Sequence, residues 1–480
     1  MSAPVKYEIV PVKTAVTILL VGLLLAVIPE IPGLRKFAGM RAQHFMALAK
    51  VPEVGVPSEP TAAMTSRGRA SPRAKAAGKE NAEAGKEPPL LPGSPYLFDP
   101  HGALRHFYDA LERTAAKEPS AVTLVLHYGD SPVTADSITA DARAMMQSRF
   151  GDAGHGFLLI AKPWAWYGHR GVELRAKGWK IEAATQGRAR DGFHGLGGVS
   201  FTGAPGAIST VTLPDDRHTR MQVLYLEQPD GGAFRLSAGE QTVGEVHTDG
   251  PEKKAAFAAF PLPAGTRQVQ LEVTSGQARL FGYSFEKPGP GVIYSSLGLN
   301  GAQVQTALRY FGVQQWTDSL RHENPDLVVL NYGTNESVDN QAYIEKLYPG
   351  ELRQVLDRIR TAVPRASLLV MSPMDRGKRE GGEIVTPSIL PEIVGIQKQA
   401  ALDSGWAFFD TFDAMGGSGT MARWYNSSPR LVSADFMHPL PGGAAKVGAL
   451  LDDALFQGYD GYRKQQQASK VARLKSESNR

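Results

Sequence analysis

The sequence has no cysteine among its 480 residues. This absence excludes disulfide bonds, thiolate metal sites and a cysteine nucleophile. The main body of the chain also lacks an excess of charge. The net charge is +4, yet residues 463–480 alone carry +5, so the other 462 residues sum to about −1. A nucleic-acid partner would require a basic face on the folded surface, so none is expected, and residues 463–480 are expected to form a basic polar tail.

The N-terminal region lacks a signal-peptide cleavage site but contains an apolar run. Thr14–Pro29 has no charged residue, and Lys6 and Lys13 precede it, which is the order of a signal peptide. A small-x-small site should follow directly, whereas Glu-Ile-Pro follows instead. The pattern predicts an uncleaved signal anchor, with a transmembrane helix within residues 1–50, in the inner membrane. The catalytic part would then lie in the periplasm or elsewhere outside the cytoplasm; the alternative is a buried core helix.

The rest of the chain divides into regions that differ in composition and in hydrophobic pattern. Residues 51–95 are rich in Pro, Ala, Gly, Lys and Glu, which predicts a flexible linker. Residues 96–163 and 288–462 alternate between helical patterns and continuous apolar runs, as in an α/β domain whose parallel strands are covered on both faces. Residues 164–287 instead show short alternating runs separated by turn residues, which favours an inserted antiparallel β-sandwich, similar to a jelly roll. We therefore expect one α/β domain in two parts, interrupted by the insert.

The stretch LVLHYGDSPVTADS is the first candidate for chemistry. An apolar, β-branched run stops at Gly129, and Asp130 and Ser131 follow. Gly, Asp and Ser are common turn residues, and Asp130 or Ser131 could simply cap the next helix. In an open parallel sheet, however, ligands bind beyond the carboxyl ends of the strands, and Ser131 is expected at such an end.

Three more polar clusters follow predicted strands. They are SLGLNGA with Gly298, GTN with Asn335, and DFMH with Asp435 and His438. A serine hydroxyl needs a base, and histidine has a suitable pKa. An acid three residues earlier can orient its ring. Taken singly, Asn335 could be a turn residue, and the acid and histidine a surface pair.

Other histidines do not point to a metal centre. His127, His155, His194 and His247 are scattered over predicted strands and loops. No acidic cluster stands at ligand spacing beside them, so neither a metal site nor a cofactor is expected.

The four clusters, in this order, resemble the four signature blocks of the SGNH (GDSL) hydrolase family. The resemblance implies a three-layer α/β fold with a parallel sheet. It also implies the role of each residue: Ser131 as nucleophile and oxyanion donor, Gly298 and Asn335 as further oxyanion donors, His438 as base, Asp435 as its partner, and Asp130 as support of the turn. Two departures are Ser296, where many members have Asn, and Pro132 directly after the nucleophile.

The whole organisation resembles the peptidoglycan O-acetylesterases of that family, which carry a carbohydrate-binding-module-like insert. The phrases FGDAGHGF and GLGGVSF are also similar to that group. The resemblance implies an esterase that removes O-acetyl groups from an acetylated polysaccharide of the cell envelope, with peptidoglycan favoured. Insert aromatics could stack on sugar rings or belong to the core: Trp179, Phe193, Phe201 and Tyr225. Two alternatives remain, an O-acetyltransferase of exported polysaccharide and an inactive saccharide-binding protein.

Overall fold

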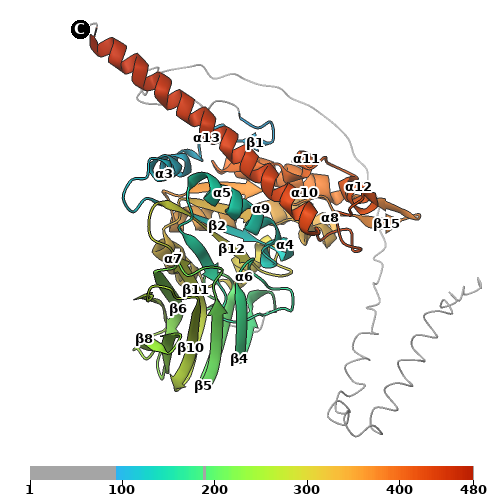
Figure 1. Cartoon of the computed structure of the whole chain (residues 1–480). Helices are drawn as coiled ribbons and strands as arrows, with labels where there is room; N and C mark the ends of the chain where they lie inside the picture. The colour runs from blue at the N-terminus through green and yellow to red at the C-terminus, as the bar shows by residue number, and fades with distance from the viewer. Residues whose placement is uncertain (1–92, 187–190, 479–480) are drawn as a thin grey trace, which may run out of the picture. The chain divides into compact units, whose positions relative to one another are not determined.

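A six-stranded sheet forms the centre of the α/β region, residues 96–163 and 288–462. The structure is a computed structural model that describes residues 93–186 and 191–478 (Figure 1). The strand order is β1-β17-β14-β13-β2-β12, and every neighbouring pair is parallel except β1 with β17. The strands are β1 (Leu97–Phe98), β2 (Val122–Gly129), β12 (Gly291–Gly298), β13 (Leu327–Asn331), β14 (Ser367–Met371) and β17 (Ala407–Phe409).

Helices cover both faces of this sheet because its strands are apolar on both sides. Neighbouring residues of one strand point to opposite faces, so Val125 packs in one core cluster and Leu126 in the other. The first face is covered by α3 (Arg105–Ala115), α5 (Ser137–Phe150) and α13 (Pro441–Ser478). The second is covered by α7 (Val313–Glu323), α9 (Tyr348–Ala362) and α10 (Ile389–Asp403). The result is a mixed α/β fold in three layers.

Shorter elements connect these layers. They are α4 (Ser131–Thr134), α6 (Val304–Tyr310), η4 (Glu336–Val338), α8 (Gln341–Lys346), β15 (Lys378–Glu380), β16 (Glu383–Val385), α11 (Thr411–Ala414) and α12 (Thr420–Asn426). The longest described helix, α13, packs against α5 and continues to Ser478 (Figure 1). Residues 463–478, expected as a separate polar tail, therefore extend this helix.

The insert is an antiparallel sheet of nine strands, seen in green in Figure 1. It comprises β3 (Gly154–Leu158), β4 (Glu173–Ala183), β5 (Val199–Thr212), β6 (Arg220–Glu227), β7 (Ala233–Ala238), β8 (Gln241–His247), β9 (Lys254–Pro261), β10 (Gln268–Ser275) and β11 (Ala278–Glu286), with the short helix η3 (Ala184–Gln186) after β4. One end of β5 pairs with β11 and the other with β10. The hydrogen bonding thus runs continuously through these strands, and the expected sandwich stays a prediction.

The insert and the α/β region share a core. The cluster that contains Leu126 and Tyr128 of β2 also contains Phe157, Phe201 and Phe281 of the antiparallel sheet. Strand β3 pairs with β11, so the antiparallel sheet includes residues on both sides of the boundary expected at Trp164. The domain boundaries otherwise stay a prediction.

The expected fold class is wrong in one respect, the N-terminal transmembrane helix. Within residues 93–186 and 191–478, no helix is both long enough and apolar enough to cross a membrane. The apolar run 14–29 and most of the linker 51–95 lie outside the described residues. Over the described residues, the structure supports a mixed α/β fold.

Candidate active site

The carboxyl ends of three parallel strands bring the polar blocks together. Gly129 at the end of β2 pairs with Gly298 of β12 on one side and with Asn331 of β13 on the other. The N–H of Leu299 also donates to the Gly129 carbonyl oxygen, at 2.9 Å. Segments that begin at Gly129, Gly298 and Asn331 therefore leave the sheet side by side.

Ser131 begins the short helix α4 directly after β2 and is buried. The Asp130 carbonyl accepts hydrogen bonds from the N–H groups of Val133 and Thr134, which closes the turn. The Asp130 side chain makes no capping hydrogen bond, so the capping interpretation does not apply to it. Pro132 fits because the first turn of a helix needs no N–H donor there.

Ser131, His438 and Asp435 form a hydrogen-bonded chain. The Ser131 Oγ lies 2.8 Å from His438 Nε2, and His438 Nδ1 lies 2.6 Å from Asp435 Oδ2. The second carboxylate oxygen, Oδ1, accepts from the backbone N–H groups of Met437 and His438, at 3.0 Å each. Phe436 adopts a left-handed conformation, φ 59°, which folds the segment so that its acid and histidine meet.

The charge of Asp435 is stabilised by these contacts. Partial burial raises the pKa of Asp435, but hydrogen bonds from Ser433 and His438 outweigh this effect and hold the pKa well below its usual range. Its carboxylate can therefore fix the ring of His438 and stabilise the imidazolium form. The side chains of Asp435 and His438 are 49% and 43% exposed, so a substrate can approach this side of the arrangement.

The two other predicted oxyanion donors lie on the neighbouring segments. Gly298 is in close contact with α4, because a Cβ built on it would lie 1.9 Å from the backbone N of Thr134. Only glycine fits this approach. The Asn335 side chain donates from Nδ2 to the Ala302 carbonyl oxygen at 2.9 Å, which ties the segment after β13 to the segment after β12. The amide nitrogen carries a second hydrogen for a further acceptor.

Asp130 is buried beneath this arrangement. Burial raises the pKa of Asp130 to about 6, although a hydrogen bond with Thr334 and the nearby His438 act in the opposite direction. Its location under the turn, rather than in the hydrogen-bonded chain, agrees with the expected role in turn support. That role stays a prediction.

Residues 265–446 match the model of the GDSL-like lipase/acylhydrolase family. This match supports the assignment of residues 265–446 to an SGNH-type hydrolase family. The matched region contains Gly298, Asn335, Asp435 and His438 but begins within the insert, so Ser131 lies outside it. No curated protein matches the chain in sequence.

Solved structures were also matched, one of them with a similar fold. A peptidoglycan O-acetylesterase has 23% sequence identity and a TM-score of 0.63, and the match covers 74% of this chain and 96% of that chain. Protein YxiM from Bacillus subtilis has 14% identity and a TM-score of 0.30, over 60% of this chain and 91% of its own. The acetylxylan esterase Axe2 from Geobacillus stearothermophilus, as a catalytic mutant, has 18% identity and a TM-score of 0.26, over 35% and 72%.

Two residues beside Asn335 were not anticipated from the sequence, Glu336 and Gln303. Glu336 is fully buried and accepts hydrogen bonds from the backbone N–H groups of Val304, at 2.7 Å, and Gly333, at 3.0 Å. Burial raises the pKa of Glu336 to about 8. Gln303 donates to the Asn335 carbonyl oxygen at 3.1 Å. Both hold the Asn335 segment in place, and the only sequence signal was an acid directly after GTN.

Ser296 links three elements around the turn that contains Ser131. Its Oγ donates to the Val133 carbonyl oxygen at 2.8 Å and accepts from Thr139 Oγ1 at 2.9 Å. The serine therefore joins β12 to α4 and α5. Through these hydrogen bonds, Ser296, which stands where many family members have Asn, helps to pack the turn that contains Ser131.

The histidines are less scattered than the sequence indicated. His155 and His169 lie with Asp136 in a buried group whose possible ligand atoms are all within 4.8 Å of one another. The Asp136 carboxylate is nevertheless already paired with Arg143, at 2.5 and 3.1 Å. It also accepts from the N–H of Arg170 at 2.9 Å. A buried guanidinium next to the carboxylate disfavours a further cation, so this group acts as an anchor for the chain after Ser131.

The insert aromatics divide into two groups. Phe201 and Tyr225 are buried and belong to the core, which is the alternative that the sequence left open. Trp179 and Phe193 are partly buried, and the Trp179 indole N–H donates to the Ile208 carbonyl oxygen at 2.9 Å. Most of these rings therefore support the sheet.

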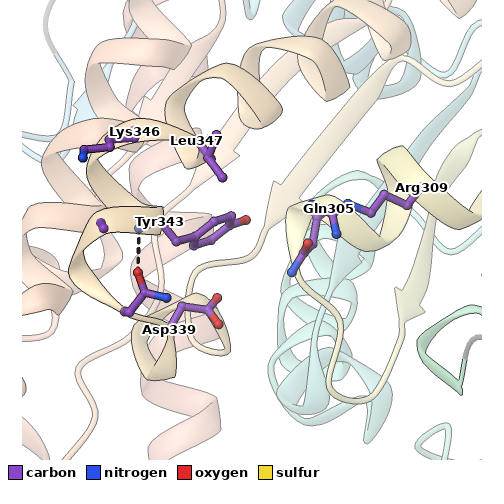
Figure 2. Close-up of a pocket in the computed structure, with 8 residues that line it drawn as sticks. Gln305, Arg309, Asp339, Tyr343, Lys346 and Leu347 are labelled. Carbon is purple, nitrogen blue, oxygen red and sulfur yellow. Dashed lines mark hydrogen bonds between the residues drawn. The ribbon is translucent and has the colours of Figure 1, made fainter. Parts of the chain in front are cut away.

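A surface pocket of about 550 Å³ lies between α6 and α8. Figure 2 shows the ring of Tyr343 pointing across it toward Gln305. Asp339 at its rim is joined to the Asn335 segment through Gln303, whose Nε2 lies 2.7 Å from Asp339 Oδ2. None of the predicted site residues lines this pocket.

Proposed function

We propose that this chain is a serine esterase that removes O-acetyl groups from a cell-envelope polysaccharide, with peptidoglycan as the favoured substrate. The hydrogen-bonded chain of Ser131, His438 and Asp435 at the carboxyl ends of β2 and its neighbours carries the proposal. The similar fold of a peptidoglycan O-acetylesterase supports the choice of substrate, since the match includes nearly the full length of that protein.

In the first half of the reaction, Ser131 Oγ attacks the carbonyl carbon of the acetyl group. His438 Nε2 accepts the serine proton, and Asp435 stabilises the resulting imidazolium. The oxyanion that forms is bound by the N–H groups of Ser131 and Gly298 and by the second N–H of the Asn335 amide. Collapse of this intermediate breaks the bond to the sugar oxygen, which takes the proton from His438 and leaves an acetyl-serine.

In the second half, water replaces the sugar. His438 removes a proton from the water, whose oxygen attacks the acetyl carbon, and the same donors bind the second oxyanion. Collapse returns the proton to Ser131 and releases acetate. The half-exposed His438 and Asp435 side chains leave room for both the polysaccharide and water.

Acetate release from O-acetylated peptidoglycan, compared with acetylated xylan and acetylated alginate, tests the proposal. We expect the purified protein to release acetate fastest from peptidoglycan and Ser131→Ala to release almost none. Transfer of labelled acetyl to added sugar hydroxyls instead of water would indicate the O-acetyltransferase alternative. Full acetate release by Ser131→Ala would contradict the mechanism.

The proposal requires the protein to meet its substrate outside the cytoplasm. Peptidoglycan lies in the cell envelope, so we expect fractionation of cells that produce the full chain to recover it with envelope or periplasmic material. Recovery in the cytosol alone would contradict this part of the proposal.

A further inference from the structure

Trp166 is the most exposed aromatic side chain among the described residues, with 54% of its surface accessible. It belongs to the segment between β3 and β4, before the long strands of the insert. Single exposed apolar side chains are common on protein surfaces. Trp166 differs from such side chains in its position and in the hydrogen bonds of its segment.

The indole ring lies beside the catalytic end of the parallel sheet. Its Nε1 donates to Asn300 Oδ1 at 3.2 Å, and Asn300 follows Gly298, the last residue of β12, by two positions. Gly298 in turn contacts the helix that Ser131 begins. Trp166 is thus held by the segment that carries a predicted oxyanion donor.

The segment around Trp166 is firmly attached although the ring itself is exposed. The hydroxyl of the buried Tyr167 accepts from the Leu159 N–H at 2.8 Å, and the buried His169 lies 3.3 Å from His155, measured between ring nitrogens. The Arg170 N–H donates to the Asp136 carboxylate at 2.9 Å. The backbone on the C-terminal side of Trp166 is therefore fixed to the chain that follows Ser131.

We propose that Trp166 binds a pyranose ring of the acetylated polysaccharide next to the ester that Ser131 cleaves. A pyranose presents flat faces of C–H groups that pack well on an indole, and burial of both apolar faces from water favours the contact. The fixed segment gives this contact at little cost in conformational entropy. The inference rests on the proposed function, because it assigns the polysaccharide of that function to a second contact beside the active site.

A binding measurement on inactive protein tests the proposal without turnover. The full chain with Ser131→Ala is titrated with soluble O-acetylated peptidoglycan fragments, and again with acetylated xylan, while tryptophan fluorescence and binding heat are followed. We expect Trp166→Ala in this background to weaken binding about tenfold. Trp166→Phe should retain part of the affinity because it retains a flat ring. Tyr310→Ala, which removes the 40% exposed ring of Tyr310 at the far end of α6, should leave the affinity unchanged.

A second measurement separates a sugar contact from a structural role. With an otherwise native chain, Trp166→Ala should raise KM for the polysaccharide about tenfold and leave turnover of p-nitrophenyl acetate unchanged. The inference would be overturned if Trp166→Ala lowered activity equally on the polysaccharide and on p-nitrophenyl acetate. It would also be overturned if Trp166→Ala bound the peptidoglycan fragments and the acetylated xylan as tightly as the chain with Trp166. If Ser131→Ala binds saccharide through Trp166 but the native chain releases no acetate from any polysaccharide, the proposed function fails and the inference stands.

Discussion

The two sheets of this molecule differ in burial and in chemistry. The parallel strands β13 and β14 are buried along their whole length, whereas β10 of the antiparallel sheet alternates between buried and partly exposed residues. Each predicted site residue lies at or just beyond the carboxyl end of a parallel strand or in the loop before α13, and none lies on the antiparallel strands. Parallel strands all end on one side, so segments distant in sequence meet there, while antiparallel strands distribute their ends over both sides.

From this difference we infer that the antiparallel sheet contributes stability and shape, and that the parallel sheet positions the predicted site residues. The shared core qualifies this division, since Phe281 and Leu126 belong to one cluster. Substitutions in each sheet can therefore test two points. The first is whether only the parallel sheet affects catalysis, and the second is whether the two sheets unfold together.

The largest expected effect is that of Ser131→Ala on the parallel side. Loss of the nucleophile should lower kcat by about 10⁶-fold, and His438→Ala should do much the same because the two residues act as one unit. Steady-state hydrolysis of p-nitrophenyl acetate measures both. The matched control is Ser200→Ala on the antiparallel sheet, whose buried Oγ has no hydrogen-bond partner in the structure, and it should retain full activity. If Ser131→Ala and Ser200→Ala lost the same share of activity, the view that only the parallel sheet carries the chemistry would be wrong.

Asp435→Asn should cost less than either of those substitutions, about 10³–10⁴-fold in kcat. The amide removes the charge that stabilises the imidazolium, but a fraction of correctly oriented rings remains. The half-exposed carboxylate also allows water to replace part of its hydrogen bonding. A loss as large as that of His438→Ala would assign Asp435 a stronger role than orientation.

Asn335→Ala should lower kcat by about 10²–10³-fold with little change in KM, because one oxyanion donor is removed. Asn340→Ala is a suitable comparison, since that asparagine caps α8 through the Tyr343 N–H at 2.9 Å. It should reduce stability by about 1 kcal/mol without a comparable loss of activity. A rise in KM at unchanged kcat for Asn335→Ala would instead place its amide in ground-state binding.

The energetic link between the sheets is tested by Phe281→Ala. This fully buried side chain of the insert lies in the shared core, so its truncation should lower the free energy of unfolding by about 3–5 kcal/mol. Thermal unfolding followed by circular dichroism should show both regions melting together at a lower temperature. Val313→Ala, at a 65% exposed position, should change little. Two separate transitions would show that the insert unfolds independently.

A smaller effect is expected from the buried carboxyl of Glu336. Its pKa is raised from 4.5 to about 8 in the folded protein, so the folded state holds a proton that the unfolded state releases. The resulting stability is present below pH 4.5 and is lost as the pH rises to about 8. In Glu336→Gln, the unfolding temperature should therefore fall less between pH 4.5 and about pH 8 than it does in the native chain. An unchanged pH profile would contradict a protonated Glu336.

Much of the site could be predicted because its residues stand in short local patterns. Ser131, with Asp130 before it, follows an apolar strand directly, and Asp435 precedes His438 by three residues. Glu336, Gln303 and the Asp136 group escaped prediction because their contacts join segments that no local pattern relates. The family model likewise begins at residue 265, because the insert separates Ser131 from the other blocks.

The sequence by itself determined where the parallel strands lie and which polar residues follow them, because burial on both faces leaves continuous apolar runs. It also carried the four blocks in an order that indicated their family. Only the tertiary structure decided that hydrogen bonding runs through all nine strands of the insert and that the insert shares a core with the α/β region. The same holds for Trp166 beside Asn300. Both features depend on strand pairing and side-chain packing between residues far apart in the sequence. Hydrophobic periodicity within a short stretch of sequence cannot predict such contacts.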